Sequence, residues 1–592
     1  MKKENITVAI LGLISGILMS IPFLVPHTGF VALFAIVPLL AMERIATITG
    51  TKHFWLYHYL TFVLWNAITT FWVCNATIGG GIFAVIANAA QMSVVFALFR
   101  LFKKKFHGAI SYIFLAAAWI SWEKFYLDWA DISWPWLVLG NSFARSIQSV
   151  QWYEYTGTLG GSLWIWACNL AIFGLMVSLS DGSFFERFNI KAKVASITGL
   201  VILIAAPFIT SAIIWHNYDE QENPIDVFIA QPNIDPYHKF EALSQSQQDA
   251  ILEGIIRQNL TVQMIDDDVT GNVVNVGNDG NTNLNNSDVD NVDKNKISNV
   301  VNDVNNVDNL VNQREKPLLI LAPETFTSYM RMDRIYDCQT WQRFTQMLKD
   351  YPGASMVFGA STYDYIVSNA SPSPVSRPLG DNYWLDSHNS AVCIDRTAST
   401  EIFHKSKLVV AVEMTPYPKI FVPIDNMLGG VMGRCIGQDE VSLLHCKTYS
   451  PDGSIDQNIP FGCAVCYESV YGNYYRDYAL KGARFMTVIT NDAWWGNTPG
   501  YRQHLSYASL RAIESRRSIA RCANTGISAI INQRGQITET TSWWEPASLK
   551  SSINMNDKQT FYTLNGDIVG RIAIFLFLLL TLNLVVHLIN RH

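Results

Sequence analysis

The chain has 592 residues, of which 49% are hydrophobic, a fraction only slightly above that of an average soluble protein. Its formal net charge of −6 argues against a nucleic-acid partner, because such partners bind basic surfaces. The average conceals two populations. Residues 1–215 and 568–592 are strongly apolar, whereas residues 216–567 have the mixed composition of a soluble domain. We therefore expect an N-terminal membrane domain of seven helices, a large polar domain and a C-terminal membrane helix.

Eight apolar segments are long enough to cross a bilayer, which takes roughly 20 residues per helix. Lysines and arginines gather at alternate ends of these segments, for example at Lys2 and Lys3, at Arg44 and Lys52, and from Arg100 onward. Because such flanks stay in the cytoplasm, we expect both termini there and the polar domain on the opposite side of the membrane. The predicted spans lie near 6–25, 29–43, 56–76, 82–100, 109–124, 160–179, 195–215 and 568–589.

The polar domain alternates short apolar runs with amphipathic stretches, which indicates an α/β fold, here a layered α-β-β-α sandwich. A turn at Arg534 and Gly535 predicts a closing hairpin over 527–540. Strands are predicted at 225–231, 317–322, 355–360, 389–394, 459–466 and 485–490, and helices at 241–262, 338–350, 472–482 and 502–522.

One stretch of the polar domain departs from this pattern. Residues 265–313 are dominated by Asn, Asp and Val and contain few aromatic residues. Such a composition cannot bury enough apolar surface to order itself. We therefore expect a flexible, low-complexity insertion there.

Three residues that could carry chemistry stand out: Glu324 follows the apolar run 317–323, Lys405 lies in the stretch 402–407, and Cys466 ends the run 461–466. Each alone has an ordinary explanation, as a solvated carboxylate, an exposed lysine or a core thiol. Together they supply a base for the thiol proton, an ammonium for an oxyanion and a nucleophile. Cys463 and Cys466 also form a Cys-x-x-Cys pair, but a redox pair would open a helix, and this one ends a strand.

The order Glu324, Lys405, Cys466, with Cys466 followed by Tyr-Glu, resembles the carbon–nitrogen hydrolase (nitrilase) superfamily. With the flanking spans, the chain is similar to the membrane-embedded branch of that superfamily, whose members N-acylate bacterial lipoproteins. The likeness covers nearly the whole chain except the Asn-rich insertion. Further matching motifs are Gln231-Pro232-Asn233-Ile234, Asn491-Asp492-Ala493-Trp494-Trp495-Gly496, Arg511-Ala512-x-Glu514, Ala523-Asn524-Thr525-Gly526-Ile527-Ser528 and Trp134-Pro135-Trp136-Leu137.

This resemblance implies that Glu324 is the general base, Lys405 the oxyanion-stabilising lysine and Cys466 the nucleophile. It implies no cofactor and no metal. The family's Leu-Val-Pro-Phe-Gly-Glu run appears here as residues 408–413 without its proline and glycine, which leaves the shape of the substrate loop open. The residues that the resemblance places around the substrate pocket are Glu413, Tyr467, Glu468, Asn491 and Trp494.

The implied reaction moves an acyl chain from a membrane phospholipid, through a thioester on Cys466, to the α-amino group of the N-terminal S-diacylglyceryl cysteine of a lipoprotein. The implied location is the bacterial inner membrane, with the catalytic domain on the periplasmic face. Three alternatives stay open. They are a membrane-tethered amidase or nitrilase with a small exported substrate, an acyltransferase with another acceptor, and a transporter or binding protein with a degenerate catalytic domain.

Overall fold

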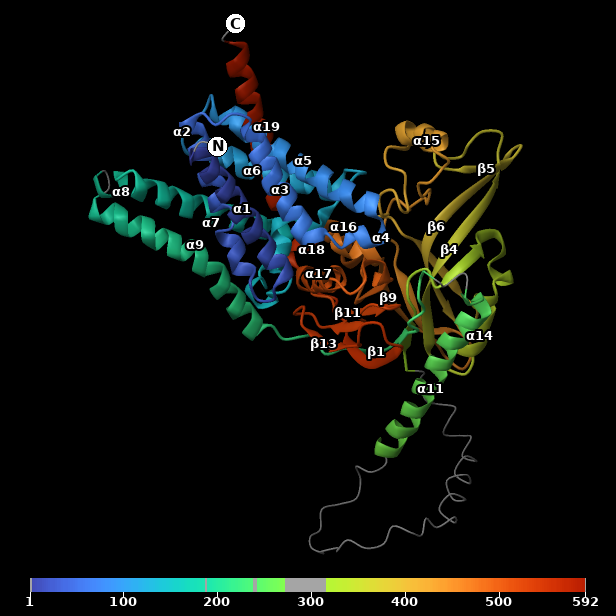
Figure 1. The fold of residues 1–592 in the computed structure, drawn as a ribbon. Helices are drawn as coiled ribbons and strands as arrows, with labels where there is room; N and C mark the ends of the chain where they lie inside the picture. The colour runs from blue at the N-terminus through green and yellow to red at the C-terminus, as the bar shows by residue number, and fades with distance from the viewer. Residues whose placement is uncertain (1–2, 187–188, 238–241, 272–315, 591–592) are drawn as a thin grey trace, which may run out of the picture.

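The computed structural model describes residues 3–186, 189–237, 242–271 and 316–590. Figure 1 shows a bundle of long helices that packs against two stacked sheets. The start of helix α1 (Lys3–Leu24) and the end of helix α19 (Ile568–Ile589) both lie on the side of the bundle away from the sheets (Figure 1). The two ends of the chain therefore approach the same side of the bundle.

All eight predicted spans are helical in the structure. Short elements join them, namely α4 (Val73–Ala76), η2 (Pro135–Leu137), η3 (Leu139–Phe143), η4 (Ile147–Ser149) and α8 (Ser183–Glu186). Besides α1 and α19, the long elements are η1 (Gly29–Leu33) with α2 (Val37–Thr49), α3 (Phe54–Thr70), α5 (Ile78–Lys103), α6 (Ala109–Asp128), α7 (Tyr153–Ser180) and α9 (Ile190–Asn217).

Six segments of the described chain are long and apolar enough to cross a membrane: α1, Gly29–Thr49, α5, α7, α9 and α19. Helix α3 has only 17 residues, and α6 carries Glu123, Lys124 and Asp128 at its end. The helical membrane domain predicted from the sequence is confirmed. Of its eight predicted spans, six are long and apolar enough to cross a membrane in the described part of the chain.

The first sheet has eight strands in the order β14-β1-β2-β4-β6-β5, with β3 paired to β4 and β7 paired to β6. Strands β1, β2 and β4 are parallel to one another, and β14 closes the edge antiparallel to β1. The strands are β1 (Pro224–Gln231), β2 (Leu318–Leu321), β3 (Thr327–Arg331), β4 (Ala354–Val367), β5 (Arg377–Gly380), β6 (Tyr383–Asp395), β7 (Thr400–His404) and β14 (Ala547–Asn554).

The second sheet has six strands in the order β13-β12-β11-β10-β9-β8. Strands β9, β10 and β11 are parallel, and β12 with β13 forms the predicted antiparallel hairpin. The strands are β8 (Leu444–Tyr449), β9 (Ile455–Val465), β10 (Met486–Thr490), β11 (Ile519–Ala523), β12 (Ala529–Ile531) and β13 (Ile537–Thr540).

Alternation along β1 shows how the layers form. Val227 and Ile229 belong to the core shared by the two sheets, whereas Phe228 and Ala230 pack beneath the helices on the outer face. Successive strand residues point to opposite faces, so one strand serves both layers. Helices α11 (Gln245–Gly271) and α14 (Gln339–Leu348) cover the first sheet, and α16 (Gly472–Leu480) and α17 (Pro499–Ser515) cover the second. The α-β-β-α sandwich predicted from the sequence is confirmed.

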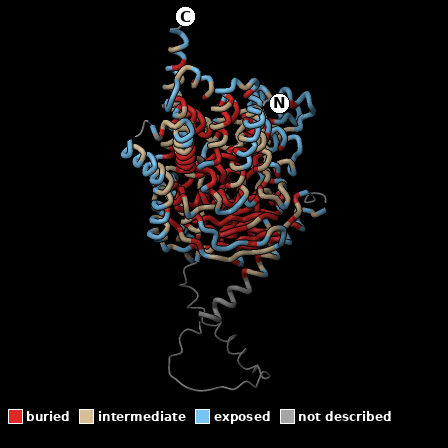
Figure 2. The backbone as a smooth tube through the Cα atoms, turned by 60° about the vertical axis from the view of Figure 1, so that its left-hand side comes forward, coloured by how far each residue is buried: buried red, intermediate tan, exposed pale blue. Residues whose placement is uncertain are grey.

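Helix α17 lies between the second sheet and the bundle, and nearly all of its residues are buried. Ala508 and Ala512 join the core cluster of the sheets, whereas Leu510 and Ile513 join the core cluster of the bundle. Buried residues run from the sheets into the bundle (Figure 2). The remaining short elements are η6 (Met332–Asp337), α15 (Pro418–Met427), η7 (Cys466–Val470), η8 (Asp492–Trp495) and α18 (Phe561–Asn565).

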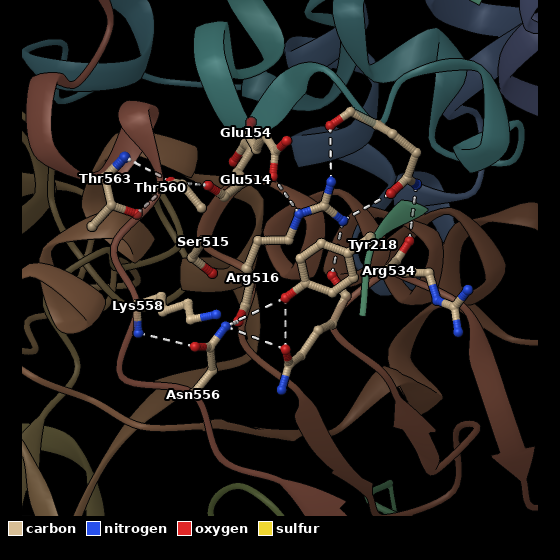
Figure 3. A network of polar contacts seen from close by, with 12 residues as sticks. Glu154, Tyr218, Glu514, Ser515, Arg516, Arg534, Asn556, Lys558, Thr560 and Thr563 are labelled. Atoms are coloured by element: carbon tan, nitrogen blue, oxygen red, sulfur yellow. Dashed lines mark hydrogen bonds and ion pairs between the residues drawn. The ribbon is translucent and has the colours of Figure 1, made fainter. Parts of the chain in front are cut away.

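Arg516, just after α17, fastens the sandwich to the bundle (Figure 3). Its Nε donates to Glu154 Oε2 on α7 at 2.7 Å, and its Nη1 donates to Gln151 Oε1 at 2.8 Å. The guanidinium also lies 4.4 Å from the ring centroid of Tyr218, which follows α9. A buried guanidinium needs such partners, so one side chain ties three segments together.

Two sequence predictions are corrected here. The predicted helix 502–522 ends at Ser515, because Arg516 adopts a left-handed conformation (φ 51°) and the next residues enter β11. The apolar pattern of α17 runs almost directly into that of β11, so hydrophobic periodicity alone predicts one long helix in place of the two elements. The predicted insertion, 265–313, begins within α11, which extends to Gly271, and the remainder of the insertion lies outside the described residues.

Candidate active site

The structure brings the three predicted residues to the ends of strands from both sheets. Glu324 follows β2, Lys405 follows β7, and Cys466 follows β9 as the first residue of η7. Lys405 is fully buried and Glu324 is 7% exposed, whereas Cys466 is partly exposed. Cys466 adopts φ 53°, a left-handed conformation that non-glycine residues rarely take. Such backbone strain is common where a side chain must be presented at a sharp turn.

Lys405 lies between two carboxylates. Its Nζ is 3.1 Å from Glu324 Oε1 and 2.9 Å from Glu413 Oε2. The side-chain amide of Asn389 on β6 donates to Oε1 of both glutamates, at 2.8 Å and 2.7 Å. Burial alone would lower the pKa of Lys405, but Glu324 and Glu413 outweigh it and hold the pKa well above its usual value. The two carboxylates therefore favour the charged, ammonium form of Lys405.

The charges of Glu324 and Lys405 both act on the thiol of Cys466. Burial raises the pKa of the Cys466 thiol well above its usual value, and Glu324 raises it further, while Lys405 opposes the rise. The sulfur is therefore protonated at rest. Any attack by this thiol requires a base that removes its proton during the reaction.

Glu468 connects the loop of Lys405 to the loop of Cys466. Its Oε1 accepts the backbone N–H of Ser406 at 2.7 Å and the hydroxyl of Tyr474 at 2.9 Å, and its Oε2 accepts the N–H of Val465 at 2.8 Å. Burial raises the pKa of Glu468 to about 7. The carboxyl thus holds the loop of Lys405 against the loop of Cys466.

Tyr467 places the thiol loop against the bundle. Its hydroxyl donates to the carbonyl of Ser133 at 2.9 Å, and its ring stacks on Trp134 with centroids 6.2 Å apart. Ser133 and Trp134 belong to the connection between α6 and α7, where the motif Trp-Pro-Trp was noted. Trp134 belongs to a cluster of four packed tryptophans, whose contacting ring centroids lie 4.7–5.9 Å apart. The cluster consists of Trp72, Trp134, Trp136 and Trp495.

The last two predicted site residues lie apart from the Glu–Lys pair. Asn491 is buried after β10 and lies 3.4 Å from the side-chain amide of Asn524. Trp494 is 39% exposed and packs edge-on against Tyr237. Neither makes a described contact with Glu324, Lys405 or Cys466.

Among the residues that the structure describes, one group of side chains offers donor atoms that could hold a metal ion: Cys466, Asp492 and His504, whose atoms lie within 4.8 Å of one another. Arg521 donates to Asp492 Oδ2 at 2.6 Å. A guanidinium therefore already balances this carboxylate, in the place where a metal ion would supply the positive charge.

Sequence reasoning missed Asn389 and the Asp492–His504–Arg521 group. Asn389 begins the predicted strand 389–394, and a polar residue at the buried end of an apolar run was a usable signal. Asp492 lies in a matched motif, whereas none of the matched motifs contains His504. Arg521 was assigned to a helix, which removed any reason to place it beside Asp492.

Comparisons with known proteins cover both halves of the chain. A family model described as carbon-nitrogen hydrolase matches residues 302–561, and one described as apolipoprotein N-acyltransferase N-terminal domain matches residues 15–171. A relative from Chlorobaculum tepidum, named apolipoprotein N-acyltransferase, is 25% identical over 95% of this chain and 94% of its own. Another of that name, from Geobacter metallireducens, is 37% identical over 18% of this chain and 20% of its own. A solved member of branch 10 of the nitrilase superfamily, from Saccharomyces cerevisiae, covers 58% of this chain and 94% of its own, with 11% identity and a TM-score of 0.33.

A carbon–nitrogen hydrolase sandwich fused to a bundle of apolar helices defines a class of membrane-embedded enzymes. The match of the N-terminal family model and the relative that spans nearly the full length extend the likeness through the bundle. The chain belongs to the apolipoprotein N-acyltransferase family.

Proposed function

We propose that the protein N-acylates lipoproteins at the membrane, taking the acyl chain from a phospholipid. The observation that carries the proposal is the Lys405–Glu324 pair acting on a thiol whose loop is hydrogen-bonded to the bundle through Tyr467. Fixing the thiol to the bundle suits substrates that are anchored in a bilayer, because anchoring raises their effective concentration. An amidase with a small exported substrate gains nothing from this attachment.

The first half-reaction forms the thioester. Glu324 takes the thiol proton as Cys466 attacks the ester carbonyl of the phospholipid, and the carbonyl oxygen becomes an oxyanion. Once Glu324 is protonated, Lys405 has lost one of its two anionic partners, and its charge becomes available to the oxyanion. When the oxyanion collapses, the ester C–O bond breaks, Glu324 returns the proton to the leaving oxygen, and lysophospholipid departs.

The second half-reaction consumes the thioester. The neutral α-amino group of the diacylated lipoprotein attacks the acyl carbon, and Glu324 takes a proton from the attacking nitrogen. The C–S bond then breaks, the amide forms, and the proton passes to the sulfur of Cys466. The enzyme is thereby restored. Exclusion of water around the thioester favours the amine over hydrolysis.

The supporting residues have separate parts in this scheme. Glu413 keeps Lys405 charged and in place while Glu324 cycles, since it stays within 2.9 Å of the ammonium. Glu468 holds the loops of Lys405 and Cys466 together, and Tyr467 fixes the Cys466 loop to the bundle. We assign Asn491 and Trp494 to the substrate pocket, as the family resemblance implies.

We infer that residues 1–215 and 568–592 form the membrane domain and residues 216–567 the catalytic domain on the periplasmic face of the inner membrane. The start of α1 and the end of α19 both lie on the side of the bundle away from the sheets, which supports this orientation (Figure 1). Arg100 and Lys103, at the end of α5, are basic residues of the kind that stay in the cytoplasm.

The decisive test uses the purified protein in vesicles of a single phospholipid. We expect mass spectrometry to show one fatty acyl group on Cys466, removable by hydroxylamine. Adding a diacylated lipopeptide with a free N-terminus should discharge it and give the N-acyl peptide, whereas the same peptide with an acetylated N-terminus should not. Release of free fatty acid without peptide acylation would favour a hydrolase, and absence of the acyl mass would refute the proposal.

A further inference from the structure

A buried polar cluster that the proposed reaction does not use lies behind the nucleophile. It consists of Asp492 on η8, His504 on α17 and Arg521 on β11, each at most 1% exposed. His504 Nδ1 is 2.9 Å from Asp492 Oδ1, and Arg521 Nη2 donates to Asp492 Oδ2 at 2.6 Å. Burial alone would raise the pKa of Asp492, but Arg521 and His504 outweigh it and hold the pKa below its usual value. The carboxylate is therefore a fixed anion.

The other nitrogen of His504 faces the nucleophile. Its Nε2 lies 3.0 Å from the backbone carbonyl oxygen of Cys466, which also accepts the hydroxyl of Ser469 at 2.8 Å. A carbonyl oxygen can only accept, so the N–H of Nε2 is the donor in this hydrogen bond. Nε2 also lies 3.0 Å from the hydroxyl oxygen of Ser469. On the opposite side, Asp492 Oδ1 at 2.9 Å and Arg521 Nη2 at 3.1 Å both contact Nδ1 and fix the orientation of the imidazole ring. A line of hydrogen bonds therefore runs from Arg521 to the peptide of the nucleophile.

The position of that carbonyl decides where the sulfur lies. Cys466 has φ 53°, and a non-glycine residue stays in this conformation only where its surroundings hold it. The carbonyl and the Cα–Cβ bond belong to the same residue, so fixing one orients the other. A sulfur released from this turn would move relative to Glu324 and Lys405, whose charges act on it.

We propose that His504, held by Asp492 and Arg521, is a positioning residue that fixes the peptide of Cys466 and thereby aims its sulfur for acyl transfer. This assignment rests on the proposed function of Cys466. This role predicts a defect in the chemical step and none in lipid binding, because the His504 side chain is fully buried and offers no surface to a lipid.

The test compares His504→Gln with His504→Leu. A glutamine amide can place an N–H close to the position of Nε2, whereas leucine has a similar size and no donor. We expect His504→Leu to lower kcat for acyl transfer by about 30-fold or more with KM changed less than about twofold. His504→Gln should stay within about fivefold of the wild type in kcat. His445→Gln is a matched control, since His445 pairs with Glu401 on β7, away from the thiol loop.

Alkylation of Cys466 by iodoacetamide at pH 8, followed on the Cys466 peptide by mass spectrometry, needs no lipid and so separates the two proposals. We expect it to be about fivefold faster or more in His504→Leu. Burial, Glu324 and Asp492 raise the pKa of the Cys466 thiol against the opposing effect of Lys405, so a sulfur released from this turn ionises more readily. His504→Gln should alkylate at close to the wild-type rate. If the wild type forms no acyl-enzyme, the proposed function fails, and this assay still tests the positioning role.

Equal losses of kcat in the two His504 variants, or wild-type alkylation in His504→Leu, would overturn the inference. Melting temperatures show whether the variants are folded. If His504→Leu does not fold, Asp492→Asn replaces it, because it keeps the shape of the side chain and removes the charge that orients the ring. Asp492→Asn should lower kcat by about tenfold or more, and a wild-type kcat in that variant would equally overturn the inference.

Discussion

The hydroxyl of Tyr467 donates to the backbone carbonyl of Ser133 across 2.9 Å, and this bond joins the residue after the nucleophile to a connection of the membrane bundle. Tyr471, the residue directly after helix η7, shares a hydrogen bond between its hydroxyl and that of Ser133. These two hydrogen bonds to Ser133 therefore fix the position of the Cys466 loop relative to the bundle.

Tyr467→Phe removes one of these bonds and keeps the ring on Trp134. We expect lipid-dependent acyl transfer to fall by about tenfold, because one buried hydrogen bond is worth about 1 kcal/mol and its loss also leaves a carbonyl unpaired. Alkylation of Cys466 should change by less than about twofold. Kinetic assays in phospholipid vesicles check both values. Tyr336→Phe, at a 66% exposed tyrosine, is the control.

Glu324→Gln should change the two reactions of the thiol in opposite directions. Glu324 contributes to the raised pKa of Cys466, so its neutralisation lowers that pKa, increases the thiolate fraction at pH 8 and speeds alkylation. Acyl transfer loses its base and should fall by about 10²–10⁴-fold. In the wild type, alkylation should keep rising with pH past 9.0, the usual thiol value, without levelling off. Equal slowing of both reactions would contradict the assigned role.

Asn389→Ala should disturb the carboxylates around Lys405. Both donors of its amide bind glutamates, and hydrogen bonds to charged groups are worth about 1.5–3 kcal/mol each, so we expect kcat to drop by about 10–100-fold. Asn389→Asp should be worse, because it adds a third carboxylate. Steady-state kinetics measures both. Asn259→Ala serves as the control, since that amide binds only a carbonyl of its own helix. A kcat near that of the wild type in Asn389→Ala would show that the glutamates hold themselves in place.

Arg516→Ala should loosen the attachment of the sandwich to the bundle. It leaves Glu154 and the Gln151 carbonyl without their partner, and breaking a buried ion pair costs about 3–5 kcal/mol. We expect a clearly lower melting temperature by thermal denaturation in detergent. Arg257→Ala, which breaks partly exposed ion pairs on α11, should cost at most about 1 kcal/mol. Similar melting temperatures for the two variants would contradict the role of Arg516 in attaching the sandwich to the bundle.

Deleting residues 272–311 should leave acyl transfer within about threefold of the wild type, because their composition does not support a packed core. Every residue assigned to the reaction lies beyond this segment. The transfer assay measures the result directly. An inactive but folded deletion variant would assign the segment a part in substrate binding.

The sequence predicted the layers and singled out Glu324 and Cys466 because both depend on local patterns. Apolar runs marked β2 and β9, and the residues that follow these strands are Glu324 and Cys466, only a few positions beyond. Lys405 required the family resemblance, since its strand β7 is short and was not predicted from its own residues. Edge strand β14 was missed for a similar reason: its residues are mostly half-exposed and lack an apolar run.

Contacts between distant segments could not be predicted. Asn389 reaches Glu324 and Glu413 only because β4 and β6 pair along their length. Arg521 meets Asp492 because β11 lies beside β10 in parallel register. The motif residues Arg511 and Glu514 hydrogen-bond to Thr158 of α7 and so help to hold the sandwich against the bundle. Their spacing in the sequence does not reveal this contact.

Helix α17 has a consequence for preparing this enzyme. Leu510 and Ile513 are covered by the bundle, so a truncated protein without its membrane helices would expose an apolar stripe to water, along with Arg511 and Glu514 stripped of Thr158. Such a fragment would aggregate rather than remain in solution. The catalytic half is thus inseparable from its anchor, and any structural or inhibitor study must keep the polypeptide whole.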